Sequence, residues 1–391
     1  MLSVSQYTGV TLRKDRLEDE RDNLTNAASL KGYKKVKVDD LIINIMLAWN
    51  GSLGISPYRG IVSPAYCIYR GNGRTFPQYF HYLLRTGYSK GDFKKVSSGV
   101  IKSRLRMYTD DFFALYTILP PLPEQRQIAA YLDYKCALID TFIAKKKRLI
   151  ELLEEQKQVI INQAVTRGID PEVPLKPSGV DWLGDIPAHW EVKKLKYYFS
   201  IRSGQVDPRK EDYKELVLIA PNHIESTTGK LLFQESAIEQ GAESGKYEVQ
   251  PGEVVYSKIR PELRKACIAQ YYCLCSADMY PIQPSKEISP AFFLYMILGN
   301  SFSRYMEELS MRVAMPKVNR EDLNNYIFTL PPLEEQIDIV SSIEKEIAGI
   351  DLTMERVEKE LTLLQEYKTT LIAEAVTGKI DLRDWSPPAE G

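Results

Sequence analysis

Two stretches of the chain decide its fold: LPPLPEQRQIAAYLD at residues 119–133 and LPPLEEQIDIV at residues 330–340. The second repeats the first 211 residues later, and the match continues without a gap, since QAVTRGID at 163–170 corresponds to EAVTGKID at 374–381. A repeat of this length is far longer than a solenoid unit. It therefore indicates a duplicated arrangement, in which a globular part is followed by a helical part.

A helical pattern follows each LPPL motif. In the first copy, apolar residues recur at alternating spacings of four and three residues, which is a heptad seam. Its apolar members are Ile128, Leu132, Ile139, Phe142, Leu149, Leu153 and Ile160. Each helix is expected to run ~40 residues, or ~60 Å at 1.5 Å per residue, and to stop at Gly168 or Gly378. Two such helices most simply form an intramolecular antiparallel coiled coil; the alternative is that each packs on its own globular domain.

The fold class that follows is α+β: two mixed α/β domains separated by two long helices. Strands are expected at Leu41–Met46, Val254–Ile259 and Ala266–Tyr272, and short helices at Gln78–Leu84 and Ala291–Ile297. A segment rich in proline and glycine separates the two copies and suits a linker. The predicted divisions are a first domain at 1–118, a helical region at 119–168, a linker at 169–184, a second domain at 185–329, a second helical region at 330–378 and a tail at 379–391.

Composition and missing motifs exclude several functions. The 391 residues are 44% hydrophobic and 26% charged, with a net charge of −1, so the chain is neither mostly disordered nor a strongly basic nucleic-acid coat. It has no membrane-length apolar stretch and no secretory signal, so we expect a cytoplasmic protein. Phosphate-binding, dinucleotide-binding and amino-methyltransferase motifs are absent, and Cys273 and Cys275 suit a buried strand better than a metal site. We therefore predict no catalytic, cofactor or metal site in this chain.

Local basic clusters depart from the balanced total charge. Clusters of lysine and arginine interleaved with tyrosine and polar residues suit contacts with DNA phosphates and neighbouring bases, although any one of them could be a solvated face. Arg104 and Arg106 align with Met315 and Lys317, just before each LPPL motif. The predicted DNA-binding residues are Lys102, Arg104, Arg106, Lys258, Arg260, Arg264, Arg312 and Lys317. Trp49 and Asn50, in a predicted turn, are weaker candidates, because a core role for the tryptophan fits equally well.

The order of these segments resembles the specificity subunit of type I restriction–modification systems. The resemblance is carried by the two LPPL segments, by QAVTRGID and EAVTGKID, by GDIPAHWEVKKLK at 184–196 and by GIVSPAY at 60–66. It implies that each domain reads one half of a bipartite target in double-stranded DNA and that the helices set the spacing. It also implies that two modification subunits dock on the helical regions with S-adenosylmethionine, and that restriction subunits bring ATP- and Mg-dependent cleavage. This chain would itself be non-catalytic and hold no cofactor.

One departure from the family pattern concerns the first domain. About 30 residues of the second domain, from GDIPAHW to the segment before Leu216, have no counterpart ahead of Leu2, so we expect the first recognition domain to be short at its N-terminal side. This leaves a reserve or non-functional recognition cassette as an alternative, beside a self-sufficient restriction–modification enzyme. Two further alternatives stand for the matched Glu124–Gln125 and Glu335–Gln336 pairs: they contact the modification subunit, or they support the LPPL turn.

Overall fold

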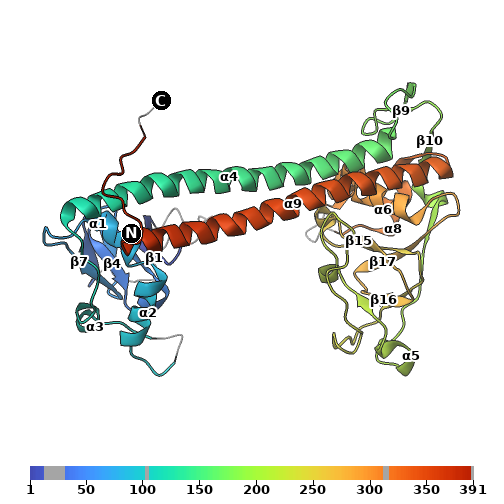
Figure 1. Cartoon of the computed structure of the whole chain (residues 1–391). Coiled ribbons are helices and arrows are strands. Elements are labelled where there is room, and N and C mark those ends of the chain that lie inside the picture. The colour runs from blue at the N-terminus through green and yellow to red at the C-terminus, as the bar shows by residue number, and fades with distance from the viewer. Residues whose placement is uncertain (13–30, 102–104, 311–316, 389–391) are drawn as a thin grey trace. The chain divides into compact units, whose positions relative to one another are not determined.

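The computed structural model describes residues 1–12, 31–101, 105–310 and 317–388 (Figure 1). The chain forms two compact units, Met1–Arg148 with Val357–Gly391 and Leu149–Arg356. Each unit contains one α+β domain together with one end of each of two long helices.

The two long helices are α4, Leu122–Arg167, and α9, Leu333–Val376. Their 46 and 44 residues are slightly longer than the sequence pattern predicts. Gly168 and Gly378, with φ angles of 77° and 75°, follow the two helix ends. A left-handed residue at this position favours glycine, which has no Cβ to clash, so the predicted helix stops are confirmed.

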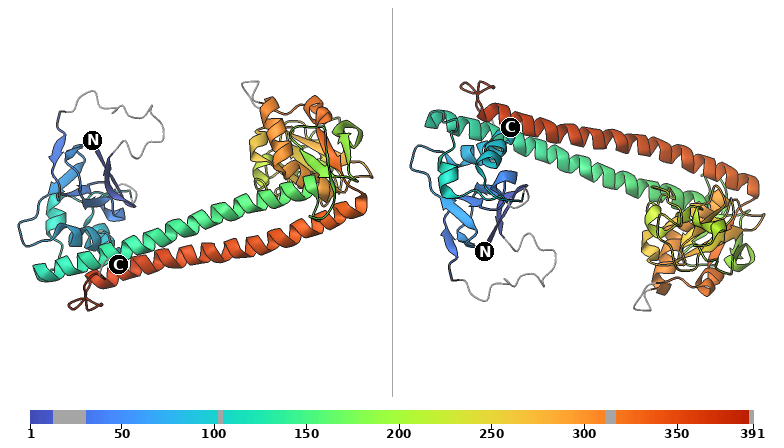
Figure 2. Two further views of the ribbon diagram at one scale, coloured as in Figure 1. Left: turned by 90° about the horizontal axis from the view of Figure 1, so that it is seen from above. Right: turned by 90° about the horizontal axis from the view of Figure 1, so that it is seen from below.

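The two helices run antiparallel and lie side by side in each unit (Figures 1 and 2). In the first unit, Lys368 Nζ lies 2.6 Å from an Asp140 carboxylate oxygen; in the second, Lys157 Nζ lies 2.5 Å from an Asp351 oxygen. Lys368 is the repeat counterpart of Lys157, and Asp351 is that of Asp140. The same contact is therefore made once in each unit, in reciprocal form. The predicted intramolecular coiled coil is confirmed.

The seam of α4 differs in part from the predicted one. Leu132 and Ile139 are buried, as expected, in a cluster that includes Leu371 and Val376 of α9. Phe142 and Leu149 are instead 58% and 36% exposed, so the prediction was wrong at these two positions. Ile143 packs against the cluster in place of Phe142. Phe142 and Ile143 are both apolar, so the sequence alone could not show which of them belongs to the seam or where the four- and three-residue spacings alternate.

The domain of the first unit is built on the antiparallel sheet β5–β4–β7, with β4 in the centre. Two further antiparallel pairs, β1–β2 and β3–β6, pack beside it around Leu2, Val4 and Ile42. Its elements are β1 Leu2–Ser5, β2 Gly9–Leu12, β3 Lys34–Val36, β4 Leu41–Asn44, β5 Leu53–Ile55, β6 Gly60–Val62, β7 Tyr66–Tyr69, α1 Pro77–Leu83, α2 Gly87–Val96 and α3 Thr109–Phe113.

The domain of the second unit has the corresponding sheet with one more strand, in the order β11–β17–β14–β15. Smaller sheets are β12–β16–β13, in which β12 and β16 are parallel, and the pairs β10–β18 and β8–β9. Its elements are β8 Leu175–Pro177, β9 Asp185–Pro187, β10 Glu191–Lys194, β11 Phe199–Ile201, α5 Glu211–Lys214, β12 Leu218–Ile219, β13 Tyr247–Val249, β14 Val254–Ser257, β15 Ala266–Ile268, β16 Cys273–Cys275, β17 Met279–Pro284, α6 Pro290–Leu298, α7 Asn300–Ser310, α8 Arg320–Asn325 and β18 Ile327–Leu330.

The predicted short elements are found, with shifted ends. β4 and β14 fall within the two expected apolar runs, whereas the run Ala266–Tyr272 forms a strand only as far as Ile268. The predicted short helices correspond to α1 and α6, each of which begins at a proline, as suits the first helical turn. The segment expected to be a linker contains β8, which pairs with β9. Cys273 and Cys275 are fully buried in β16, as predicted.

Candidate nucleic-acid interface

Three of the predicted DNA-binding residues of the second unit lie on neighbouring segments at the end of β14. The chain continues from β14 into Lys258, whose carbonyl oxygen accepts a hydrogen bond from the Val318 amide at 2.8 Å. Ile259 and Lys317 form an isolated β-bridge in the same place. Arg260 follows in the left-handed conformation, with a φ of 49°, and is exposed. The fold therefore brings Lys258, Arg260 and Lys317 together, although about 60 residues separate them in sequence.

Tyr280 of β17 lies at the centre of this basic cluster. The Lys258 Nζ is 5.0 Å from the centroid of its ring, and the Arg320 guanidinium carbon is 5.8 Å away, both within cation–π distance. Arg320 is held in place by hydrogen bonds from its guanidinium to Ser203 Oγ and the Arg202 carbonyl, each 3.1 Å long. From the sequence, Arg320 belongs to a basic cluster but was not selected as a DNA-binding residue, and Tyr280 gave no signal, because its role depends on β17 lying next to β14.

The cluster of Lys258, Lys317 and Arg320 carries unbalanced positive charge. Burial lowers the pKa of Lys258, and repulsion from Lys317 and Arg320 lowers it further, while Asp278 acts in the opposite direction. An incoming anion would relieve this repulsion, so the geometry suits a phosphate group.

Arg264 has a different environment from the other predicted residues. Its guanidinium donates hydrogen bonds to Ser303 Oγ at 2.9 Å, to Gln158 Oε1 of α4 at 2.9 Å and to Asn300 Oδ1 at 2.6 Å. These bonds join the turn after β14 to α4 and α7. Its φ of 47° is left-handed, and the corresponding position in the first domain holds Gly51, with a φ of 91°. Arg264 thus positions this turn against the long helix.

The first unit places Arg106 where the second unit places Lys317. The amide of Met107, the next residue, donates to the Ile45 carbonyl at 3.0 Å, just as the Val318 amide donates to Lys258. Arg106 and Lys317 are both exposed. Ile45 and Thr109 stand where the second unit has Lys258 and Arg320, so Arg106 is the one cation of this cluster that the described part of the first unit keeps. Lys102, Arg104 and Arg312 lie outside the described residues.

Trp49 and Asn50, the weaker DNA-binding candidates of the first unit, make hydrogen bonds within their own turn. The Trp49 indole N–H donates to the Met46 carbonyl at 3.2 Å. The Asn50 side-chain oxygen accepts bonds from the Ser52 amide and hydroxyl at 3.2 and 3.0 Å. Both side chains are half-buried, and the polar groups named here are used locally.

The matched glutamines after the LPPL motifs support the turn. Gln125 accepts a bond from the Phe76 amide and donates to the Arg74 and Pro120 carbonyls. Gln336 accepts from the Ser289 amide and donates to the Glu287 and Pro331 carbonyls. The two glutamines make the same set of three bonds, and both side chains are completely buried. The structural alternative is therefore confirmed for both glutamines.

The matched glutamates differ between the units. The Glu335 carboxylate accepts a bond from the Trp190 indole at 3.0 Å and lies 2.7 Å from His189 Nε2. It thereby holds the GDIPAHW segment against the start of α9. No such tryptophan or histidine reaches Glu124 among the described residues of the first unit.

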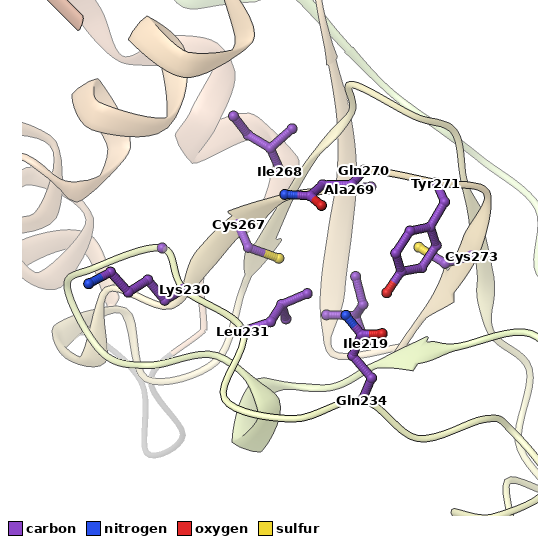
Figure 3. A pocket seen from close by; sticks show the side chains of 11 residues that line it. Ile219, Lys230, Leu231, Gln234, Cys267, Ile268, Ala269, Gln270, Tyr271 and Cys273 are labelled. Atoms are coloured by element: carbon purple, nitrogen blue, oxygen red, sulfur yellow. The ribbon is translucent and has the colours of Figure 1, made fainter. Parts of the chain in front are cut away.

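A recess of about 450 Å³ lies elsewhere in the second unit (Figure 3). Ile219, Cys267 and Cys273 line its apolar part, and Lys230, Gln234 and Tyr271 contribute polar groups. Burial raises the pKa of the Tyr271 hydroxyl, and Gln234 acts on it in the opposite direction. The sequence held no signal for this recess, because its walls come from strands β12, β15 and β16 and from the segment 229–234, which are separate in sequence.

The described residues include no group of three histidine, cysteine or acidic side chains that could hold a metal ion. No described helix is long and apolar enough to cross a membrane. Two similar α+β domains, each with a cation beside the end of its central strand, are joined by antiparallel helices. This arrangement defines a tandem recognition protein.

Comparison with known proteins shows which family of proteins this chain is similar to. Residues 187–363 match the family described as Type I restriction modification DNA specificity domain. The chain is 29% identical over 360 residues to the Type I restriction enzyme EcoDI specificity subunit of Escherichia coli, covering 86% of this chain and 78% of the relative. It is 27% identical over 310 residues to the putative type I restriction enzyme MjaX specificity subunit of Methanocaldococcus jannaschii, covering 78% and 69%.

Solved structures share the fold. A chain from a structural study of complex assembly and conformational transition of the type I R–M system matches with a TM-score of 0.69 at 17% identity, covering 90% of this chain and 85% of that one. The HsdS subunit from Thermoanaerobacter tengcongensis matches with a TM-score of 0.54 at 18% identity, covering 90% and 84%. Over most of its length, the chain is therefore similar to specificity subunits of type I restriction enzymes, and it shares their fold.

Proposed function

We propose that each domain of this chain reads one half of a bipartite, asymmetric target in double-stranded DNA. The observation that carries this proposal is the matched placement of Arg106 and Lys317, each of which precedes a residue whose amide donates to a carbonyl just after the central strand. A duplicated reader contacts two separate half-sites, as dimeric DNA-binding proteins do with two subunits.

Within each domain, we assign the exposed cations to the DNA backbone. Lys317 and Arg320 are exposed beside the buried Lys258, and the three form a cluster suited to phosphate; exposed Arg106 takes the place of Lys317 in the first domain. Exposed Arg260, directly after the cluster, is placed to approach a base edge, where arginine pairs well with guanine. Lys102, Arg104 and Arg312 remain proposed contacts from their positions in sequence. Arg264 is assigned to positioning rather than DNA contact, because its guanidinium is bonded internally.

The long helices are proposed to set the distance between the half-sites and to dock two modification subunits. A helix of 46 residues is ~69 Å long at 1.5 Å per residue, so its length suits a spacer. Apolar side chains are exposed along one stripe of α4 at helical spacing, as a docking surface would require. The stripe consists of Leu138, Phe142, Leu149, Leu152 and Val159.

The chemistry is assigned to the partners. Modification subunits would bind S-adenosylmethionine and methylate adenine, and restriction subunits would bring ATP- and Mg-dependent translocation and cleavage. The assembled complex would work in the cytoplasm, where it meets DNA.

Binding to DNA tests this proposal. We expect the chain alone to bind a target fragment weakly and the complex with modification subunits to bind it tightly. Lys317→Ala should weaken binding by the complex, whereas Lys176→Ala, an exposed lysine of β8, should leave it unchanged. Equal binding by both variants and the parent complex would contradict the assignment. Tight binding of a split site by the chain alone would contradict the dependence on partners.

A further inference from the structure

The hairpin 224–231 of the second domain contacts both the long helix α9 and the loop that follows β14. Its turn is tight: the Glu225 amide donates to the Lys230 carbonyl at 2.9 Å, and Gly229, with a φ of 76°, turns the chain. A Cβ at Gly229 would lie 3.0 Å from a methyl carbon of Leu294, so the tip of the hairpin packs closely on α6. The hairpin is therefore held in a defined place on its domain.

Lys230 connects the hairpin to α9. Its Nζ lies 2.9 Å from one carboxylate oxygen of Asp351, and the Nζ of Lys157 in α4 lies 2.5 Å from the other. Burial raises the pKa of this carboxyl group, but its hydrogen bonds with the two lysines lower the pKa by more, so the carboxylate keeps its charge. Asp351 therefore joins three elements: the hairpin and both long helices.

The loop after β14 completes this connection. The Thr227 amide of the hairpin donates to the Arg264 carbonyl at 3.3 Å, and the Ser226 hydroxyl donates to the carbonyl one residue earlier. The Arg264 guanidinium in turn donates to Gln158 of α4 at 2.9 Å. Gln158 directly follows Lys157 in sequence, so the contacts form a closed ring that starts and ends on α4. The ring consists of Lys157, Asp351, Lys230, Thr227, Arg264 and Gln158.

Arg260 lies in the short turn that this ring holds. The Leu263 amide donates to the Arg260 carbonyl, and the Arg264 amide donates to the Pro261 carbonyl, both at 2.9 Å. Arg260 is thereby fixed to Arg264 within one turn, although its own side chain is exposed. A shift of the hairpin against α4 would therefore move the exposed guanidinium as well.

The first domain has no such link at the corresponding place. Gly51 stands where the second domain has Arg264, so no side chain extends from that turn to the long helices. Thr369, the counterpart of Gln158, donates its hydroxyl to the Gln365 carbonyl within α9. A change in the ring should therefore affect only what the second domain does.

Given the base-reading role proposed for Arg260, we propose that Lys230 and Gln158 are positioning residues that determine how strictly the second domain reads its half-site. An arginine on a fixed turn presents its planar guanidinium to one base edge, whereas a turn that moves lets it reach several. A turn that is fixed before DNA binds also loses less conformational freedom in the complex. Lys230 and Gln158 act through the turn, since the polar groups of both are used inside the ring.

Competition binding by the complex with modification subunits tests this proposal. The probes are the split-site duplex found by mapping methylation and duplexes that differ from it by one base pair. Arg260→Ala should lower discrimination at one base pair of one half-site by about tenfold. Lys230→Met and Gln158→Met should each lower it at the same base pair by about three- to fivefold, because each removes one partly exposed polar contact. The other half-site should be read as before.

Two controls separate positioning from other roles. Lys230→Met should leave the salt dependence of binding unchanged, because Lys230 contacts no phosphate, and Lys230→Arg should keep the discrimination, because it keeps the ion pair. Lys193→Met, which removes an ion pair with Glu191 inside β10, should change neither quantity. A lower salt dependence in Lys230→Met would make this lysine a phosphate contact and would overturn the proposal.

A double variant shows whether Lys230 acts through Arg260. Arg260→Ala with Lys230→Met should discriminate no worse than Arg260→Ala alone, since a positioning residue has no effect once the residue it positions is gone. Additive losses, or full discrimination in Lys230→Met beside a loss in Arg260→Ala, would overturn this inference and leave the proposed function standing. Full discrimination in Arg260→Ala would contradict the base-reading role itself, and this inference with it.

Discussion

Replacing Gln336 with methionine tests the three buried hydrogen bonds that hold the start of α9 in place. Methionine has a similar length and volume but cannot make hydrogen bonds of comparable strength. Gln336 accepts a bond of 2.9 Å from the Ser289 amide and donates bonds of 2.9 and 3.0 Å to the Glu287 and Pro331 carbonyls. The variant therefore leaves three backbone groups without this partner in a site from which water is excluded.

The expected loss follows from counting these bonds. A hydrogen bond contributes about 1 kcal/mol net, and an unsatisfied buried group costs about 1–3 kcal/mol. Three bonds give a loss of about 3 kcal/mol in the free energy of unfolding of the second unit. The loss should be at the lower end of the range if water reaches the two carbonyls, since a carbonyl is more easily solvated than a buried amide.

Urea unfolding followed by circular dichroism measures this loss, and hydrogen exchange localises it. The Ser289 amide should exchange faster in Gln336→Met. Gln125→Met, which removes the same three bonds from the first unit, should cost a similar amount there. Gln365→Met, on an exposed face of α9, should change stability by less than about 0.5 kcal/mol. If the Gln336→Met chain were as stable as the Gln365→Met chain, the stabilising role of the three Gln336 hydrogen bonds would be refuted.

Three further predictions concern charges. Lys157→Met should lower the stability of the second unit by about 1 kcal/mol, and Lys368→Met should cost less, because its partner carboxylate is more exposed. Burial and the nearby Arg85 lower the pKa of His81 from 6.5 to about 4, so the first unit should lose up to about 3 kcal/mol as pH falls through this window. His81→Gln should flatten that loss. Lys317→Ala and Arg106→Ala should each reduce the salt dependence of DNA binding, log K against log salt, by about 0.9.

Each of these predictions has a clear contrary result. Denaturant unfolding would contradict the first if Lys368→Met cost more than Lys157→Met. A stability profile that rises on acidification from pH 6.5 to 4 would contradict the second, because a lowered histidine pKa favours the unfolded chain as protons bind. Titrations of DNA at several salt concentrations would contradict the third if both slopes matched that of the parent complex.

The sequence was sufficient to predict the architecture, because the repeat and the heptad spacing are local signals. Leu132, Ile139 and the terminal glycines are where the pattern puts them. The exact seam was not predictable, because Phe142 and Ile143 are both apolar and only packing selects between them. Strand ends shifted for a similar reason: the run Ala266–Tyr272 is mostly apolar, but the strand ends at Ile268.

The candidate interface was predictable only in part. The offset of 211 residues correctly paired Arg106 with Lys317, because a repeat preserves position. It could not show that the Arg264 guanidinium is bonded to α4, since a charge count does not reveal burial. The sequence placed Arg320 in a basic cluster but could not show that Arg320 and Lys258 both lie beside the Tyr280 ring, which depends on the register of β14 with β17.

The measurement that tests the central claim most directly is a map of adenine methylation in cells that express this chain with its modification subunit. Two domains that each read a half-site predict a split, asymmetric motif with a fixed spacer, absent from cells that lack the chain. Lys317→Ala should reduce methylation at that motif without producing a different one, because a phosphate contact carries no sequence information. A symmetric or continuous motif would contradict the assignment of one half-site to each domain, and methylation that does not depend on the chain would contradict its role in recognition.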